Sequence, residues 1–237
     1  MSEKLPIYFL PGTLCTEAVF SHQINVLTSA GYLVNVVQFT TERSINEMVN
    51  TCLEKMNGSP GVVIGFSMGG IVALALAKKH PALIEQLCLI GSNCHADLPE
   101  RQIPRQQHIS EAKTTSLTDV LSKYYLPNYL FTNNQQHQQL ILNMAETLSI
   151  ECFESQLAAL STREDTLAVL EALTCPVLLL AGSDDKLCNA EHQLKMHQHC
   201  PSSDLVLLNC SGHFPMLERA KTTSTLLLSW LNPKEPS

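Results

Sequence analysis

Three polar residues follow short apolar runs, and together they have the side chains needed for nucleophilic catalysis. Ser67 comes directly after the run 61–66, Asp185 comes just after 176–182, and His213 follows 205–208. A serine hydroxyl is a weak nucleophile at neutral pH, so it needs a base within hydrogen-bond reach and a third group that orients the base. The three residue types supply these roles, and the pattern predicts a serine nucleophile that forms an acyl intermediate.

The chain around Ser67 predicts a tight turn between a strand and a helix. The run 61–66 is β-branched and aromatic and too short for a helix, whereas helix-forming residues continue from Ile71. Gly65 and Gly69 are small enough to let the strand and the helix close on each other. The positive end of the helix can then stabilise an oxyanion. The alternative is a serine that only caps the helix.

The acid and the base are each open to a second interpretation. Asp184 and Asp185 are adjacent, and the residues alone do not decide between them. His213 is the one histidine of nine in a Gly-His-Phe-Pro loop directly after a predicted strand, and its alternative is a solvent-exposed loop histidine.

A metal site is not expected from the other histidines. His192 and His199 are spaced to share a helix face, but His197 does not join them and there is no second cluster of ligands. We therefore expect surface histidines here, and no metal or other cofactor.

Strands and helices are predicted to alternate around the three candidate residues. Strands are expected at 7–10, 32–39, 61–66, 84–90, 176–182 and 205–208, and helices at about 17–29, 44–56, 71–80, 190–199 and 222–231. This alternation indicates an α/β protein with a mostly parallel sheet and helices on both faces. Ligands of such sheets bind beyond the carboxyl ends of the strands, which is where Ser67 is expected.

Residues from about 96 to 173 depart from this alternation. They contain no convincing strand, their Asn and Gln content rises at 133–139, and helical periods occur at 117–125, 138–148 and 151–160. We expect one domain over residues 1–237, with a helical lid inserted at about 96–173 after the fourth strand. The alternative is that part of this segment is ordinary surface helix.

Composition limits the cellular location and the classes of binding partner that we expect for this protein. A chain of 237 residues with 45% hydrophobic residues and a net charge of −7 fits a soluble globular domain with no basic surface, so neither nucleic acid nor a membrane is expected as a partner. The amino-terminal residues lack an apolar signal region, which predicts a cytoplasmic protein. The nine cysteines include Cys88, Cys175 and Cys210 in apolar runs, and we expect reduced, buried thiols.

The chain from Ile7 to Trp230 resembles the α/β-hydrolase superfamily in several separated loops. Gly65 to Gly69 is similar to the family's nucleophile turn, and Leu10-Pro11-Gly12-Thr13 to its first oxyanion segment, although Pro11 stands where histidine is commoner. Gly182-Ser183-Asp184-Asp185 is similar to its Gly-x-x-Asp, and the loop from Gly212 to Glu218 to its histidine loop. Small bacterial carboxylesterases and pimeloyl-carrier methyl ester esterases are nearest in size and layout.

The resemblance implies a role for each motif residue. Ser67, Asp185 and His213 would form a catalytic triad, with Asp184 as the alternative acid. The backbone N–H groups that bind the oxyanion would be those of Thr13 and Met68, with Leu14 as the neighbouring possibility.

The resemblance also implies a carboxylic ester or thioester as the substrate. Its acyl chain is expected to meet apolar residues of the first loop, the lid and the histidine loop, which are Leu14, Tyr124, Phe153 and Phe214, although packing within the lid explains the lid residues equally well. An acidic acyl-carrier protein is a further candidate partner for the basic residues Arg101, Arg105, Lys113 and Lys123, whose alternative is a solvated surface.

Two departures from the family are visible. The antiparallel strands with which these proteins usually open are expected to be missing. Relatives acting on dicarboxylates, such as the menaquinone-pathway synthase, are expected to have arginine early in the nucleophile helix, where this chain has Gly70, Ile71 and Val72.

The rival functions are other chemistry on the same fold, such as a carbon–carbon bond hydrolase or a cofactor-free peroxidase, and a binding protein without catalysis.

Overall fold

A parallel sheet forms the centre of the protein in the computed structural model, which describes residues 4–232. Within that range the sheet has six strands in the order β2-β1-β3-β4-β5-β6, and each pair of neighbours is parallel. The strands are β1 (Ile7–Leu10), β2 (Val34–Val36), β3 (Gly61–Phe66), β4 (Ile84–Ile90), β5 (Val177–Gly182) and β6 (Asp204–Leu208). The predicted α/β architecture is confirmed, and five of the six strands lie within one residue of their expected bounds.

The prediction for β2 was wrong in length, since only Val34–Val36 is a strand where 32–39 was expected. This strand is at the edge of the sheet and pairs with β1. The last hydrogen bond between these two segments runs from the backbone N–H of Val37 to the carbonyl oxygen of Phe9 at 2.9 Å. Because β1 ends at Leu10, the residues after Val37 have no strand beside them with which to continue the ladder.

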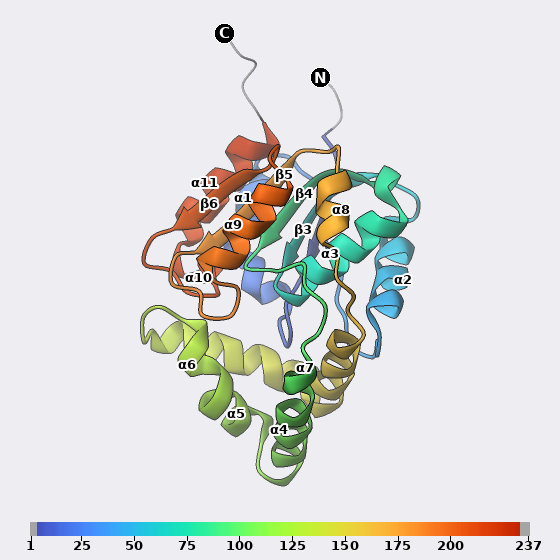
Figure 1. The fold of residues 1–237 in the computed structure, drawn as a ribbon. Coiled ribbons are helices and arrows are strands. Elements are labelled where there is room, and N and C mark those ends of the chain that lie inside the picture. Colours follow the sequence, from blue (N-terminus) through green and yellow to red (C-terminus); the bar gives the residue numbers. More distant parts are fainter. Residues whose placement is uncertain (1–3, 233–237) are drawn as a thin grey trace.

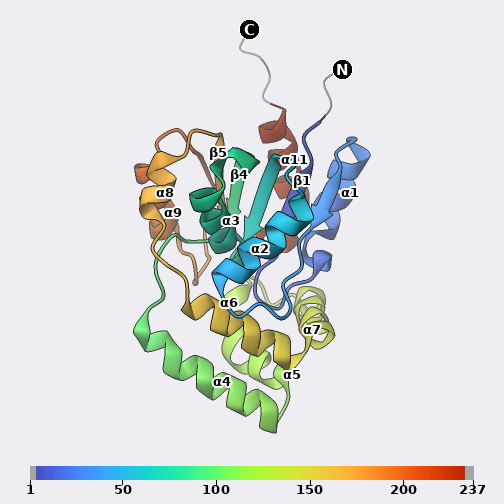
Figure 2. The same cartoon turned by 90° about the vertical axis from the view of Figure 1, so that its right-hand side faces the viewer.

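Two helical layers cover the sheet (Figures 1 and 2). One contains α1 (Ser21–Ser29) and α11 (Ala220–Leu231), and the other contains α2 (Ile45–Met56), α3 (Met68–Lys79), α8 (Leu167–Ala172) and α9 (Ala190–His199). Short helices η1 (Glu17–Phe20), η2 (Pro81–Leu83) and α10 (Pro215–Glu218) lie in the connections. Because strand side chains alternate, Ile7 and Phe9 pack in the core under α1 while Tyr8 and Leu10 pack in the core under α3.

Helices also fill the connection between β4 and β5, and several gather beyond one end of the sheet (Figures 1 and 2). They are η3 (Pro99–Arg101), α4 (Gln102–Thr114), α5 (Leu117–Val120), η4 (Leu121–Tyr125), α6 (Leu126–Tyr129) and α7 (Gln135–Ser161). We interpret the segment from η3 to Arg163, just after α7, as the lid. The periods at 138–148 and 151–160 belong to α7, whose helix is interrupted at Ser149 (φ 77°, ψ 169°).

Helix α4 was not predicted, because its sequence has almost no apolar periodicity. Ala112 is its one buried residue, Ile109 is only partly buried and Ile103 is exposed, so no apolar stripe runs along the helix.

The cysteine prediction was correct for most positions and wrong for one. All nine are free thiols, and seven of them are buried, including Cys88. Cys175 is partly buried, and Cys210 is exposed because it lies in the turn after β6 with a positive φ of 53°. Among the described residues, no helix is both long and apolar enough to cross a membrane.

Candidate active site

Ser67 occupies a strained turn between β3 and α3. Its backbone angles, φ 50° and ψ −112°, lie in a region that residues other than glycine seldom adopt. Its N–H donates to the carbonyl oxygen of Ile90 at 2.9 Å, and its carbonyl oxygen accepts the hydroxyl of Ser92 at 2.8 Å. A Cβ at Gly69 would collide with the carbonyl oxygen of Leu10, so the turn requires glycine there. The turn therefore places Ser67 on the wall of a pocket.

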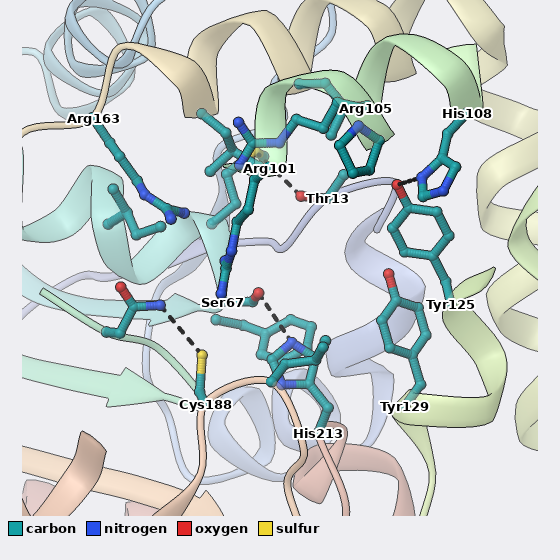
Figure 3. A pocket seen from close by; sticks show the side chains of 18 of the residues that line it. Thr13, Ser67, Arg101, Arg105, His108, Tyr125, Tyr129, Arg163, Cys188 and His213 are labelled. Carbon is teal, nitrogen blue, oxygen red and sulfur yellow. Dashed lines mark hydrogen bonds between the residues drawn. The ribbon is translucent and has the colours of Figure 1, made fainter. Parts of the chain in front are cut away.

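The three predicted polar residues meet in one hydrogen-bonded chain. The Nε2 atom of His213 lies 3.0 Å from Oγ of Ser67, and its Nδ1 atom lies 2.8 Å from Oδ2 of Asp185. Figure 3 shows the first of these contacts at the edge of a pocket. In the tautomer that fits both, Nδ1–H donates to the carboxylate and Nε2 accepts the serine proton. Asp184 is exposed and bonds to Ser183 instead, so the structure brings Asp185 to the histidine.

Asp185 is held as a carboxylate by its surroundings. Burial alone would raise its pKa, but the charge and hydrogen bond of His213 and the N–H groups of Cys188 and Leu187 outweigh burial, so its pKa lies below the ordinary value. Those N–H groups donate to Oδ1 at 3.0 and 2.8 Å, which leaves Oδ2 for the imidazole. The loop after β5 thus fixes both the ionisation and the direction of this carboxylate.

The end of α6 and the lid segment after it hold the loop that carries His213. The backbone N–H of His213 donates to the carbonyl oxygen of Tyr129 at 2.7 Å, and the two rings stack with their centres 5.8 Å apart. The carboxylate of Glu218 accepts the N–H of Gly212 and the N–H of Phe131, both at 2.7 Å. These positioning roles of Tyr129 and Glu218 were not predicted, since the contacts Tyr129–His213 and Glu218–Phe131 join residues far apart along the chain.

The two proposed oxyanion donors lie on the pocket wall. Thr13 and Met68 both line the pocket, whereas Leu14, which was expected to contact the substrate, does not. Leu14 is buried, and its N–H donates to Oε1 of Gln156 at 2.8 Å. The amide nitrogen of Gln156 in turn donates to the carbonyl oxygen of Phe39 at 2.8 Å. Because its N–H has a partner, Leu14 is a poor alternative to Thr13.

A cavity of about 290 Å³ lies next to Ser67. Aromatic side chains form one side of it, as Figure 3 shows for Tyr125 and Tyr129. Phe214 lines the cavity, whereas Tyr124 and Phe153, which were expected to line it, do not. The hydroxyl of Tyr124 donates to Glu111 on the lid surface, and Phe153 is fully buried behind Tyr125.

Arginine side chains line the same cavity, a role that was not predicted from the sequence. Arg101 and Arg105 were expected in a docking surface, and no role was predicted for Arg163, but all three line the cavity. The other two basic residues of that group pair elsewhere, Lys113 with Glu154 at 2.7 Å and Lys123 with Glu111 at 2.8 Å. An arginine-rich cavity wall has no local signature, because its residues come from both ends of the lid.

One group of described residues has side chains close enough together to hold a metal ion. Ligand atoms of Asp185, Cys188 and His213 lie within 4.8 Å of one another. Two of these residues already bond to each other, and burial raises the pKa of the Cys188 thiol to about 12. The histidines of α9 lie elsewhere, with the ring of His192 against His95 and His199 paired with Glu171.

Comparison with known proteins places this chain in a family. The family described as serine aminopeptidase, S33, matches residues 28–218 of this chain. A pimeloyl-[acyl-carrier protein] methyl ester esterase of Neisseria meningitidis serogroup C is 26% identical over 175 residues, covering 71% of this chain and 68% of the relative. A 2-hydroxy-6-oxononadienedioate/2-hydroxy-6-oxononatrienedioate hydrolase of Cupriavidus pinatubonensis is 24% identical over 234 residues, covering 90% and 81%.

A solved structure shows the same fold over nearly the whole chain. The thermophilic esterase of Thermogutta terrifontis superposes with a TM-score of 0.86 at 22% identity, covering 96% of this chain and 89% of the esterase. The predicted α/β-hydrolase fold is confirmed by this likeness.

Proposed function

The chain belongs to the serine aminopeptidase S33 family of α/β-hydrolases and is an enzyme of the carboxylic ester hydrolase type, and from this premise we propose that it cleaves its ester or thioester through an acyl-enzyme on Ser67. The observation that carries the proposal is the unbroken hydrogen-bonded chain from Ser67 through His213 to Asp185 beside the cavity.

The proposed reaction has two halves. The Ser67 oxygen attacks the carbonyl carbon and passes its proton to Nε2 of His213, while the N–H groups of Thr13 and Met68 stabilise the negative oxygen. The alcohol or thiol then leaves with the proton from His213. Water attacks the acyl group in the second half, His213 takes its proton, and the acid leaves as Ser67 regains its hydrogen. Asp185 orients the imidazole and stabilises its positive form in both halves.

Replacement of the nucleophile tests this proposal. We expect Ser67→Ala to lower kcat on p-nitrophenyl acetate by about four to six orders of magnitude. A fluorophosphonate probe should label the wild-type protein at Ser67, found by peptide mass spectrometry, and should leave the variant unlabelled. Full activity in the variant would contradict the proposal.

Other substrates separate the proposal from its rivals. Alanine p-nitroanilide tests the aminopeptidase activity that the family is named for, and a vinylogous 1,5-diketone acid tests the carbon–carbon bond cleavage suggested by the Cupriavidus relative. Preference for either over simple esters would replace ester hydrolysis as the function. If the protein hydrolyses none of these substrates and is not labelled by the fluorophosphonate probe, the binding-protein alternative would be favoured.

An acyl-carrier protein as the bearer of the acyl group is a second candidate, favoured by the name of the Neisseria relative. Of the four basic residues considered for docking, Lys113 and Lys123 are exposed on the lid surface, each in an ion pair. Reversal of both charges, Lys113→Glu with Lys123→Glu, should slow hydrolysis of a carrier-bound ester but not of a free one. Equal rates on the carrier-bound ester would remove this candidate. The cytoplasmic location stays a prediction.

A further inference from the structure

Three guanidinium groups gather on one side of the cavity next to Ser67. Arg101 ends η3, Arg105 lies in the first turn of α4, and Arg163 follows α7. Figure 3 shows the three side chains on the side of the pocket opposite Tyr125 and Tyr129. The cavity therefore has a cationic side and an aromatic side.

Two of the three arginines share one buried carboxylate. Asp97 accepts both terminal nitrogens of Arg105, at 2.6 and 2.8 Å, and Nη2 of Arg163 lies 3.1 Å from its Oδ1 atom. The side chains of Asp97 and Arg163 are only 6% and 5% exposed. Asp97 thus holds both guanidinium groups in place and has its own oxygens occupied by them.

The remaining donors have no partner. Arg101 is exposed, and across residues 4–232 no hydrogen bond or ion pair involves its side chain, so its donors are free on the cavity wall. The Nε atom of Arg163 is buried, lies on a residue that lines the cavity, and is also without a partner. A buried guanidinium N–H is costly to leave unpaired, which favours an acceptor near Arg163, and the exposed donors of Arg101 are the ones that an anion in the cavity can reach directly.

The charges lead to the same conclusion. Three guanidinium groups stand against two carboxylates, those of Asp97 and the exposed Glu100, which leaves one positive charge without a counterion. Burial lowers the pKa of Arg163, and the charges of Arg101 and Arg105 lower it further. The first turn of α4 has no acidic residue, so the positive end of this 13-residue helix adds to the repulsion. An anion bound beside Arg101 would relieve it.

We propose that the natural substrate is an ester or thioester that carries a carboxylate, which binds Arg101 and Arg163 while its apolar part lies against the aromatic side. This inference rests on the proposed function and names the substrate class. A single carboxylate matches the one uncompensated charge and the fork of N–H donors that arginine presents. Residues Gly70, Ile71 and Val72 of α3 carry no charge, so the lid arginines are the ones placed to do this.

Paired substrates test the inference. Mono-p-nitrophenyl glutarate against p-nitrophenyl pentanoate places the carboxylate on the acyl side, and 4-acetoxybenzoate against 4-acetoxybenzamide places it on the alcohol side. We expect the kcat/KM ratio of charged to neutral ester to fall roughly 10- to 100-fold in Arg101→Gln for one pair, because a charge-assisted bond is lost. Arg101→Lys, which keeps the charge without the fork, should fall in between.

A matched control and a binding measurement complete the test. Arg43→Gln makes the same charge change at an exposed arginine outside the cavity and should leave both ratios unchanged. In Ser67→Ala protein, calorimetry should show that Arg101→Gln weakens glutarate binding by a similar factor.

Unchanged ratios in both pairs together with unchanged glutarate binding would overturn the inference. If the wild-type protein hydrolyses none of these esters, the proposed function is contradicted. The glutarate-binding measurement would then decide the inference by itself.

Discussion

The side-chain oxygen of Gln156 accepts the backbone N–H of Leu14 at 2.8 Å, although 142 residues separate the two along the chain. The same side chain donates to the carbonyl oxygen of Phe39, so one fully buried amide joins α7 to the loops that follow β1 and β2. Thr13 is the neighbour of Leu14, and this bond therefore helps to fix the proposed oxyanion donor. The lid contributes to the geometry of the reaction as well as to the pocket wall.

Removal of this amide should weaken both stability and catalysis. We expect Gln156→Leu to lower the free energy of unfolding by about 1–3 kcal/mol for each buried group left unpaired, and to reduce kcat on p-nitrophenyl acetate about tenfold. Urea unfolding and steady-state kinetics measure the two effects. Gln139→Leu, an exposed position of the same helix, is the control. A folded Gln156→Leu protein with full kcat would show that the loop needs no such support.

The two adjacent aspartates should differ sharply. Asp185→Asn keeps the shape of the side chain but removes the charge that fixes the histidine tautomer, and should lower kcat by about four orders of magnitude. Asp184→Asn changes an exposed carboxylate bonded only to Ser183 among the described residues, and should change kcat less than about threefold. Both rates can be measured on one short ester. The opposite order would make Asp184 the acid of the triad.

Asp97 should stabilise the fold at neutral pH and lose this effect in acid. Burial raises its pKa, but the hydrogen bond and charge of Arg105 and the charge of Arg163 outweigh burial, so the net pKa is lowered. A lowered native pKa stabilises the fold above the unfolded value of about 3.9, and the contribution disappears as pH falls through the native pKa.

Asp97→Asn should therefore cost about 3 kcal/mol of unfolding free energy at pH 7, because removal of one partner leaves buried arginines without compensation, and the cost should decrease progressively as the pH falls below the unfolded pKa of about 3.9. Denaturant titrations at several pH values measure this. Asp204→Asn, at an exposed strand end, should show no such trend. A difference that stays constant with pH would mean that the ion pairs are not responsible.

Thiol reagents should distinguish two cysteines. Burial raises the pKa of Cys188 to about 12, so its thiolate is scarce near pH 8, whereas Cys210 is exposed. Iodoacetamide should alkylate Cys210 first, by peptide mass spectrometry, and esterase activity should survive that step. Early alkylation of Cys188 with loss of activity would show that the pocket opens more than this structure indicates.

Local sequence was sufficient for the sheet and for the three residues of the proposed triad. The runs that became β1, β3, β4 and β5 are apolar because both faces of a parallel strand are buried, and this signal needs no knowledge of distant residues. The length of the edge strand β2 was misjudged because Val37 and Phe39, which follow it, are buried apolar residues although they are not in a strand.

The proposed triad could be predicted to converge because it follows from strand direction. Parallel strands end at one edge of a sheet, so polar residues just beyond their carboxyl ends must approach one another. The choice between Asp184 and Asp185 did not follow from this rule, because neighbouring residues in a turn point in different directions. It required the resemblance, and in the structure the N–H groups of the loop after β5 direct Asp185 toward His213.

The sequence by itself determined the layered sheet and the loops that carry Ser67, Asp185 and His213, because burial of strands and tight turns are encoded by neighbouring residues. Only the tertiary structure decided the cavity. Its cationic side contains Arg101 and Arg163, which come from opposite ends of the lid. The loop after β1, which contributes Thr13 to the cavity wall, is held by Gln156. These contacts depend on how helices pack in three dimensions, and a polar helix such as α4 leaves no periodic pattern from which that packing could be inferred.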